Sequence, residues 1–196
     1  SGKVVWYGSD GSDNEIYIYD IQIGTVTQIT DNSYDDQSAR INSGKVVWKT
    51  RTSSSDSTNE IFLYDISSGI TTQITNDSYS DLYPQVDGSA GRVVWNKEVS
   101  SGSDYDIYLY DIASGISTKI EDNAFSDSTP LIDSGNVVWS ASDRVNDYEI
   151  YLYDISNGIR TQITNNGTND FGPKINNGRI VWHGYDGVDF EIFLYA

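Results

Sequence analysis

The chain has 196 residues and a formal net charge of −17, from 12 basic and 29 acidic side chains. This acidic balance excludes the basic surface that nucleic-acid binding requires. It also disfavours docking on anionic lipid and favours divalent cations as counterions. The alternative explanation of the negative charge is that it keeps the protein soluble. The sequence has no cysteine, which excludes disulfide and thiolate chemistry, and no apolar run approaches the roughly 18 residues of a membrane-spanning helix.

One motif recurs along the whole chain. It reads EIYIYDIQIGTVTQIT at Glu15, EIFLYDISSGITTQIT at Glu60, DIYLYDIASGISTKIE at Asp106 and EIYLYDISNGIRTQIT at Glu149, and its first half returns as EIFLYA at Glu191. A Gly-x-Val/Ile-Val-Trp run precedes each copy and opens at Gly2, Gly44, Gly91, Gly135 and Gly178. A fixed period of about 44 residues indicates a solenoid, a propeller or an array. We therefore interpret residues 1–196 as a single repeat domain whose last repeat is partial.

Each period contains four short strand signals rich in β-branched and aromatic residues. In the second period we expect strands over Lys45–Lys49, Glu60–Ile66 and Ile70–Thr75, and a further strand over Gln85–Asp87 after Pro84. No segment shows a sustained apolar period of 3.6 residues, so we expect no helix.

The second strand of each period is apolar on both faces. Ile61 and Leu63 point to one side of the strand, and Phe62 and Tyr64 point to the other. A sheet covered on both faces fits stacked propeller blades better than a sandwich, in which each sheet has one wet face. We expect the tryptophans of the inner blades to be buried between blades at equivalent places: Trp48, Trp95 and Trp139.

The connections between strands carry turn chemistry. The Tyr-Asp-Ile-x-x-Gly segments place an aspartate that can bond the turn backbone and a glycine that can take a positive φ. The joints at 42–44, 133–135 and 176–178 are typical of tight hairpins. We interpret these residues as structural; the aspartate and glycine pairs are Asp20/Gly24, Asp65/Gly69, Asp111/Gly115 and Asp154/Gly158.

The combined pattern VVW…EIYLYDI…G…TQIT…D..P.I resembles the TolB-like β-propeller repeat, in the variant found in secreted and cell-surface proteins. The resemblance covers the whole chain. It implies an all-β propeller of about five four-stranded blades around a central channel, a place outside the cell or on its surface, and a binding or scaffolding role. It does not imply catalysis, and a fold alone does not fix a function.

The end blades depart from this pattern. With strands named A (inner, x-Pro-x-Ile), B (VVW), C (EIYLYD) and D (TQIT), 18 strands are visible; the first blade lacks A and the last lacks D. Either the chain is a piece of a larger propeller, or another polypeptide completes its edges, or the termini meet within one chain. Unpaired edges invite strand addition, so the expected partner is protein, foremost other copies of this chain.

Four aspartates stand seven residues beyond the isoleucine of strand D, in the loops that lead to strand A. Carboxylate oxygens converging there would suit Ca²⁺. The alternative is that each aspartate caps the backbone of its own loop. These candidate metal ligands are Asp36, Asp81, Asp127 and Asp170.

The loops between strands B and C supply a second candidate calcium site. Asp10, Asp13 and Glu15 surround a glycine at short spacing, and Asp186, Asp189 and Glu191 do the same in the last repeat. This arrangement matches an EF-hand loop only in part. A solvated acidic rim is the alternative. Calcium is the one cofactor that the sequence suggests.

Little in the sequence indicates catalysis. The single histidine, His183, has no cysteine partner, and neither a G-x-S-x-G elbow nor a phosphate-binding glycine loop occurs. We therefore expect a non-enzymatic scaffold for protein interaction and self-assembly, stabilised by calcium. A lectin-like propeller that binds polysaccharide is the alternative, and a glycosidase using a carboxylate pair is a more distant one. Exposed tyrosines that could stack on sugar rings, or pack between blades instead, are Tyr34, Tyr79, Tyr83 and Tyr185.

Overall fold

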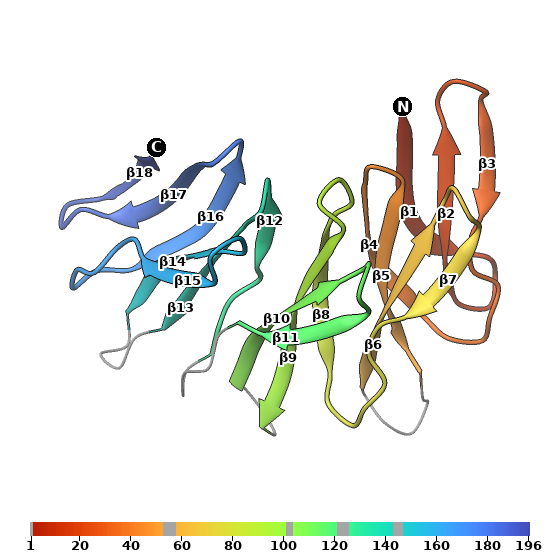
Figure 1. Ribbon diagram of the computed structural model, residues 1–196, viewed down its shortest axis with the longest axis horizontal. Helices are drawn as coiled ribbons and strands as arrows, with labels where there is room; N and C mark the ends of the chain where they lie inside the picture. Colours follow the sequence, from red (N-terminus) through yellow and green to blue (C-terminus); the bar gives the residue numbers. More distant parts are fainter. Residues whose placement is uncertain (1, 53–57, 101–103, 121–125, 143–146) are drawn as a thin grey trace. The chain divides into compact units, whose positions relative to one another are not determined.

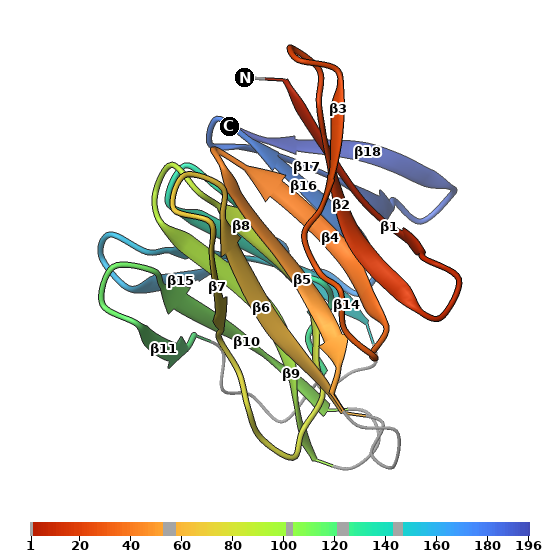
Figure 2. The ribbon, with the colours of Figure 1, turned by 90° about the vertical axis from the view of Figure 1, so that its right-hand side faces the viewer.

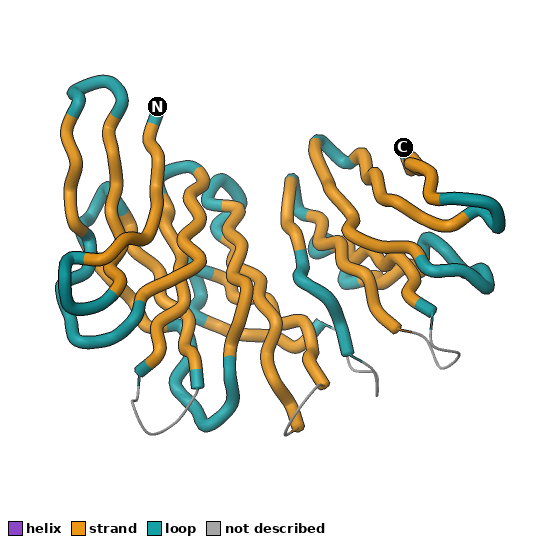
Figure 3. The backbone as a smooth tube through the Cα atoms, turned by 180° about the vertical axis from the view of Figure 1, so that it is seen from behind, coloured by secondary structure: helices purple, strands orange, loops and turns teal. Residues whose placement is uncertain are grey.

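The computed structural model describes residues 2–52, 58–100, 104–120, 126–142 and 147–196. The regular elements in these ranges are β-strands joined by loops and turns (Figure 3). The ranges hold 18 strands, the number expected from the repeat. The chain divides into two compact units, Ser1–Ser89 and Ala90–Ala196, with the division just before the glycine that opens the third repeat. No helix in the described part of the chain is long and apolar enough to cross a membrane.

Unit 1 contains β1 to β8 (Figure 2). Strands β1-β2-β3 form a three-stranded antiparallel sheet, and β4-β5-β6-β7 form a four-stranded one. Strand β8, the last of the unit, lies beside β4, β5 and β6. Within each sheet the strand order is the chain order, so each sheet is a meander of hairpins. The bounds are β1 (Lys3–Ser9), β2 (Asn14–Asp20), β3 (Thr25–Gln28), β4 (Asp36–Asn42), β5 (Lys45–Arg51), β6 (Asn59–Asp65), β7 (Ile70–Gln73) and β8 (Asp81–Asp87).

Unit 2 contains β9 to β18 and repeats the same meander (Figure 1). Strands β9, β10 and β11 pair in succession, β12-β13-β14-β15 form a four-stranded sheet, and β16-β17-β18 form a three-stranded one. The bounds are β9 (Arg92–Ser100), β10 (Asp104–Asp111), β11 (Ile116–Lys119), β12 (Leu131–Asp133), β13 (Asn136–Ser142), β14 (Tyr148–Asp154), β15 (Ile159–Gln162), β16 (Asp170–Asn176), β17 (Arg179–Tyr185) and β18 (Phe190–Tyr195).

Neighbouring sheets within a unit pack by one rule. Each sheet has an Ile face, which carries the apolar residues equivalent to Ile16 and Ile18, and a Trp face, which carries those equivalent to Val46 and Trp48. The Ile face of one sheet packs on the Trp face of the next, as these four residues do in unit 1. In unit 2 the same rule joins Ile107 and Leu109 to Trp139, and Ile150 to Trp182.

The inner tryptophans lie where the repeat predicts them. Trp48, Trp95 and Trp139 are 1%, 1% and 0% exposed. Each stacks on the aromatic residue directly opposite it on the neighbouring strand; the ring centroids of Trp48 and Phe62, for example, are 5.8 Å apart. Their predicted burial is confirmed, and it shows that the apolar residues on both faces of these strands serve sheet stacking.

Three inner strands, β4, β8 and β16, begin earlier than the sequence pattern indicates, whereas β12 begins directly after Pro130. Strand β8 starts at Asp81 rather than after Pro84. Tyr83, just before this proline, has a φ of +54°, and Ser38 and Gly172 have φ values of +60° and +58° at the equivalent places in β4 and β16. The strand register shifts at both of these latter sites. A β-bulge lets proline, which has no N–H, sit inside a strand, so proline is a poor marker of this strand's start.

The outer strands end earlier than the TQIT motif. Strand β7 stops at Gln73, two residues before the expected end. The Ile61 N–H instead donates to the hydroxyl of Thr75 at 2.9 Å. The side chain thus replaces a backbone acceptor. Two other repeats use the same bond, from Ile16 to Thr30 and from Ile150 to Thr164.

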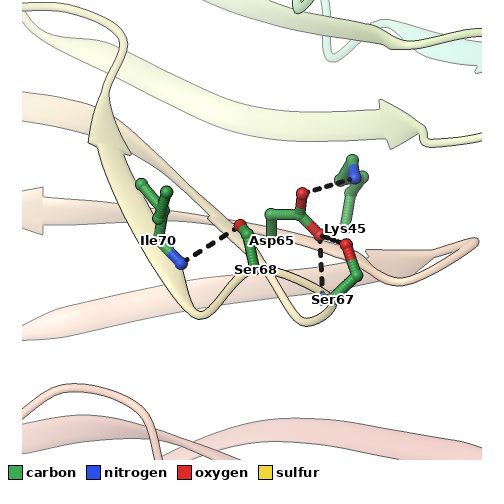
Figure 4. A network of polar contacts seen from close by, with 5 residues as sticks. All are labelled: Lys45, Asp65, Ser67, Ser68 and Ile70. Carbon is green, nitrogen blue, oxygen red and sulfur yellow. Dashed lines mark hydrogen bonds and ion pairs between the residues drawn. The ribbon is translucent and has the colours of Figure 1, made fainter.

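The turn after each EIYLYD strand is built around its aspartate, as predicted (Figure 4). Asp65 Oδ1 accepts the N–H and the hydroxyl of Ser67 at 2.9 and 2.7 Å, and Oδ2 pairs with Lys45 at 3.0 Å. The Ser67 hydroxyl, and next the Lys45 ammonium, hold the pKa of Asp65 far below its ordinary value. Gly69 donates to the Asp65 carbonyl and has a φ of +71°. These residues are structural, as the sequence indicated.

Candidate functional site

The loop between β1 and β2 is organised by Asp10. Its Oδ1 accepts the N–H of Ser12 at 2.8 Å and that of Asp13 at 3.3 Å, and the Asp10 N–H donates to the Asp13 carbonyl at 3.1 Å. Gly11, between them, has a φ of +112°. These backbone bonds lower the pKa of Asp10 and use only one of its two carboxylate oxygens.

Glu15, at the start of the following strand, is 0% exposed. Its Oε1 accepts the Asn32 N–H at 2.7 Å, whereas its buried Oε2 has no hydrogen-bond partner among the described residues. Burial raises the pKa of the Glu15 carboxyl; hydrogen bonds from Thr30 and Asn32 oppose the shift, and the charge of Asp36 adds to it. A buried carboxylate oxygen without a donor calls for a proton or a cation.

Asp31, in the loop between β3 and β4, brings a third carboxylate to the same place. One oxygen each of Asp10, Glu15 and Asp31 lie within 4.8 Å of one another. Asp10 and Asp31 are exposed and Glu15 is buried, so the cluster has a buried floor and an open side. The pKa of Tyr17 is raised by burial and then by the negative charges of these three carboxylates, which places its hydroxyl within their field.

Asp13 lies in the same electrostatic environment. Its Oδ1 is buried without a hydrogen-bond partner in the described ranges. Burial raises the pKa of Asp13 first, followed by the charges of Asp10, Asp35, Asp36 and Asp31. The structure therefore brings the predicted Asp10 together with Glu15 and adds Asp31, whereas Asp13 lies outside this close group.

Asp31 is the residue that the sequence interpretation missed. It stands 16 residues after Glu15, where the second and fourth repeats carry Asn76 and Asn165. An acidic residue in a position that carries asparagine in two of the other repeats was the available signal.

The four aspartates expected in the loops before the inner strands are buried, at 0–4% exposure, and three of them are the first residues of β4, β8 and β16. Trp48 Nε1 donates to Asp36 Oδ1 at 3.2 Å, Thr50 also donates to this oxygen, and Asn32 Nδ2 donates to Oδ2 at 2.8 Å. These bonds correspond to a structural, capping role for Asp36. Calcium binding at the four positions stays a prediction. Tryptophan bonds of the same kind join Trp139 to Asp127 and Trp182 to Asp170, and Asp81 is equally buried.

The loop between β17 and β18 has the same turn as the first hairpin. Asp186 Oδ1 accepts the N–H groups of Val188 and Asp189 at 2.8 and 3.1 Å. Glu191, the counterpart of Glu15, is exposed. Among the described residues, Asp10, Glu15 and Asp31 form the only close group of three acidic, histidine or cysteine side chains, so Asp186 and Asp189 are not brought into such a group.

A groove of about 560 Å³ lies in unit 1 next to the acidic cluster. Asp31 and Tyr34 line it from the loop between β3 and β4, and Phe62, Thr71 and Gln73 line it from β6 and β7. The groove thus combines an aromatic ring that is 41% exposed, Tyr34, with hydroxyl and amide groups. The other candidate tyrosines are also exposed, at 43% for Tyr79, 51% for Tyr83 and 37% for Tyr185.

The two terminal sheets each leave one face exposed. On the first sheet it is the Trp face: Val4 is 47% exposed and Trp6 is 36% exposed. On the last sheet it is the Ile face, where Val181, Ile192 and Leu194 are 37%, 75% and 63% exposed. The equivalent residues of β5 and β6 are at most 5% exposed; they are Val46, Trp48, Val47, Ile61 and Leu63.

Antiparallel four-stranded meanders that pack face to face are typical of the blades of β-propellers. No family model and no curated protein matches the sequence. Among solved structures the chain is similar to TolB from Acinetobacter baumannii, with a TM-score of 0.67 and 16% identity over 99% of this chain and 50% of that one. It is also similar to oligogalacturonate lyase from Vibrio parahaemolyticus, with a TM-score of 0.73 and 12% identity over 98% of this chain and 58% of the lyase. The chain thus spans about half the length of TolB, and the expected likeness to TolB-like propellers is confirmed at the level of the fold.

The repeat was the reason to predict that the chain is not an enzyme, and this prediction is wrong. The similar structures include enzymes: the oligogalacturonate lyase, and a puromycin hydrolase with a TM-score of 0.64 and 14% identity over 93% of this chain and 31% of the hydrolase. A repeated propeller pattern therefore does not argue against catalysis. At these identities the likeness shows the fold alone and assigns no reaction to this chain. His183, the single histidine, is exposed and lies near Phe171 and Phe190, with ring centroids 5.8 and 6.1 Å away.

Proposed function

We propose that this chain is a binding and assembly module whose copies associate through the exposed faces of the terminal sheets. The observation that carries the proposal is the mismatch between terminal and inner sheets. Ile192 and Leu194 are largely exposed, although the equivalent residues of inner sheets are buried against a neighbouring sheet. Exposed contiguous apolar surface of this kind is typical of an interaction site.

The two exposed faces are of complementary types. Within each unit an Ile face packs on a Trp face; the first sheet leaves a Trp face exposed and the last sheet an Ile face. The last sheet of one copy can therefore receive the first sheet of another through the contact that the units already use. Such a head-to-tail contact is heterologous, so it produces a ring where the rotation closes and a filament where it does not.

The solution mass over a range of protein concentrations tests the assembly proposal. The 21.8 kDa chain should form larger species as its concentration rises. Replacing Ile192 and Leu194 together by aspartate should return it to a monomer, because two charges would be buried in the contact.

Ile159→Asp is the matched control, because Ile159 is also an exposed strand residue, at 56%, but lies on the outer strand β15. It should leave the association unchanged. A wild-type chain that stays monomeric at every concentration, or an equal effect of the control, contradicts the proposal. If the two terminal sheets instead pack on each other within one chain, the wild-type protein will stay monomeric at every concentration.

Carbohydrate binding in the groove beside Tyr34 is a second candidate function. The support is the combination of an exposed aromatic ring with Thr71 and Gln73, since sugar rings offer apolar faces and hydroxyl edges. The net charge of −17 favours neutral over acidic oligosaccharides. Titration calorimetry with neutral oligosaccharides should detect binding that Tyr34→Ala abolishes and that Tyr79→Ala, at a tyrosine outside the groove, retains. Absence of binding in the wild type would exclude this role.

We place the module outside the cell or on its surface. The support is the resemblance of its repeat to those of secreted and cell-surface propellers, together with acidic loops suited to the calcium concentrations that extracellular modules use. Fractionation of cells that express the full-length gene tests this location. Recovery of the protein from the cytoplasm alone would contradict it.

A further inference from the structure

We propose that Asp10, Glu15 and Asp31 form a calcium site that joins the loop between β1 and β2 to the loop between β3 and β4. The inference is independent of the assembly proposal, because none of the three is among the apolar residues that form the two exposed terminal faces. It differs from the sites expected from the sequence in adding Asp31 as a ligand, from a different loop, and in leaving Asp36 to its structural bonds.

The spacing of the three oxygens fits the ion. Calcium binds carboxylate oxygens at about 2.3–2.6 Å, so two ligands on opposite sides of it are about 5 Å apart. One oxygen from each residue already lies within 4.8 Å of the others. Hard oxygen donors with no nitrogen or sulfur among them match calcium, magnesium or manganese rather than zinc or copper.

The buried oxygen of Glu15 is the second observation; Glu149 Oε2 is also buried without a partner, but among the described residues only Glu15 lies in a close group with two further carboxylates. Glu15 is 0% exposed, and its Oε2 lacks a hydrogen-bond partner in the described residues. An ionised carboxylate in such a place needs a positive partner, which a cation held by Asp10 and Asp31 on the open side would supply.

The loop geometry leaves ligand oxygens available. The turn uses Asp10 Oδ1 for two backbone N–H groups, so its second oxygen can reach the ion. Within the described residues no ion pair neutralises the three carboxylates or Asp13. Calcium sites of extracellular modules bind at about 10⁻⁴–10⁻³ M.

Thermal unfolding of the wild-type chain in calcium and in EDTA tests the site. The melting temperature should rise with calcium, half-maximally between about 10⁻⁴ and 10⁻³ M. Asp31→Asn should lose most of this rise. This variant is expected to fold, because asparagine already occupies the equivalent position in two other repeats, at Asn76 and Asn165.

Asp186→Asn is the matched control. It alters the same turn in the β17–β18 hairpin, where no third carboxylate completes a group, and it should keep the calcium response of the wild type. A wild type without a calcium response, an Asp31→Asn variant that keeps the full response, or a loss as large in the control as in Asp31→Asn would each overturn the site.

Glu15→Gln tests the site through a rise in melting temperature in the absence of calcium. It retains an oxygen for the Asn32 N–H and removes the buried charge, so in EDTA at neutral pH the variant should melt above the wild type. In saturating calcium this advantage should disappear, because the wild type gains the ion and the variant does not. Terbium luminescence excited through Tyr17 should likewise require Asp31 and not Asp186. Equal calcium shifts in Glu15→Gln and wild type would overturn the role of Glu15.

Discussion

At the scale of single residues, the most unusual groups are carboxylates that are buried without a full set of hydrogen-bond donors. Glu149, the counterpart of Glu15 in unit 2, is 0% exposed. Its Oε1 accepts the Asn166 N–H at 2.8 Å, and its Oε2 has no hydrogen-bond partner among the described residues. Burial raises the pKa of Glu149; bonds from Thr164 and Asn166 oppose the shift, and the charges of Asp170 and Asp147 add to it.

Glu149→Gln should make the protein more stable at high pH. Because the pKa of Glu149 is higher in the folded than in the unfolded chain, its favourable contribution is complete below the unfolded pKa and is lost as the pH rises through the folded pKa. Glutamine keeps the acceptor for Asn166 and carries no charge. Urea unfolding should show a gain in the free energy of unfolding at pH 8 that vanishes near pH 4; a loss at pH 8 would contradict this account.

Asp154→Asn, in the same strand, is a control of opposite sign. The hydroxyl and then the backbone N–H of Ser156 lower the pKa of Asp154, so its stabilising contribution is present above the unfolded pKa and is lost as the pH falls through the folded one. The variant should therefore be less stable than the wild type at pH 8, with a smaller difference in acid.

The sequence located part of the candidate site. Asp10 and Asp13 stood out because acidic residues around a glycine mark a turn that offers oxygens. Asp31 did not, because its partnership with Glu15 depends on strand β3 turning back beside β2, and spacing along the chain does not show which loops meet. The same limit concealed that Asp36 already bonds Trp48 and Asn32.

At the scale of the elements, the repeat predicted each strand type, and the differences arose at strand ends. The TQIT strands stop early because a threonine hydroxyl takes over as acceptor. Three of the four inner strands start early, before a residue of positive φ that belongs to a bulge in β4 and β16. Both are local exceptions to regular strand pairing, the first made by a side chain and the second by the backbone. Residue propensities do not predict either of them.

The bulge predicts the effect of exchanging its residues. Ser38 has a φ of +60° and Gly172 a φ of +58° at the equivalent place. A non-glycine residue in this region costs about 1–2 kcal/mol, partly offset by the chain entropy of glycine. Ser38→Gly should therefore raise the free energy of unfolding by about 0.5–1 kcal/mol, measured by urea denaturation.

The reverse exchange should destabilise the protein. In Gly172→Ser the new Cβ would lie 3.1 Å from His183 Cε1, so steric crowding adds to the backbone strain. A stabilised Gly172→Ser variant, or a destabilised Ser38→Gly variant, would show that the positive φ is not a source of strain.

At the scale of the whole molecule, one interface type repeats, and the stability of such a protein is close to a sum over repeats and their contacts. The sequence predicted this repetition well, because the period and the apolar residues on both strand faces are visible in it. It did not identify which face packs on which, because the pairing of Ile and Trp faces depends on the direction in which the sheets stack.

The stacking rule predicts unequal effects for equivalent tryptophans. Trp48 is 1% exposed, packs on Ile16 and Ile18 and donates to Asp36, so Trp48→Ala should lower the free energy of unfolding by about 3–5 kcal/mol. Trp6, at the same place in the first sheet, is 36% exposed and stacks on Tyr17 with a centroid distance of 5.6 Å. Trp6→Ala should cost only about 1–2 kcal/mol in dilute protein. Chemical denaturation of both variants measures the difference. Equal losses would mean that burial between sheets does not set the stability of the stack; a Trp6 effect that grows with protein concentration would instead show its face becoming covered in the assembly.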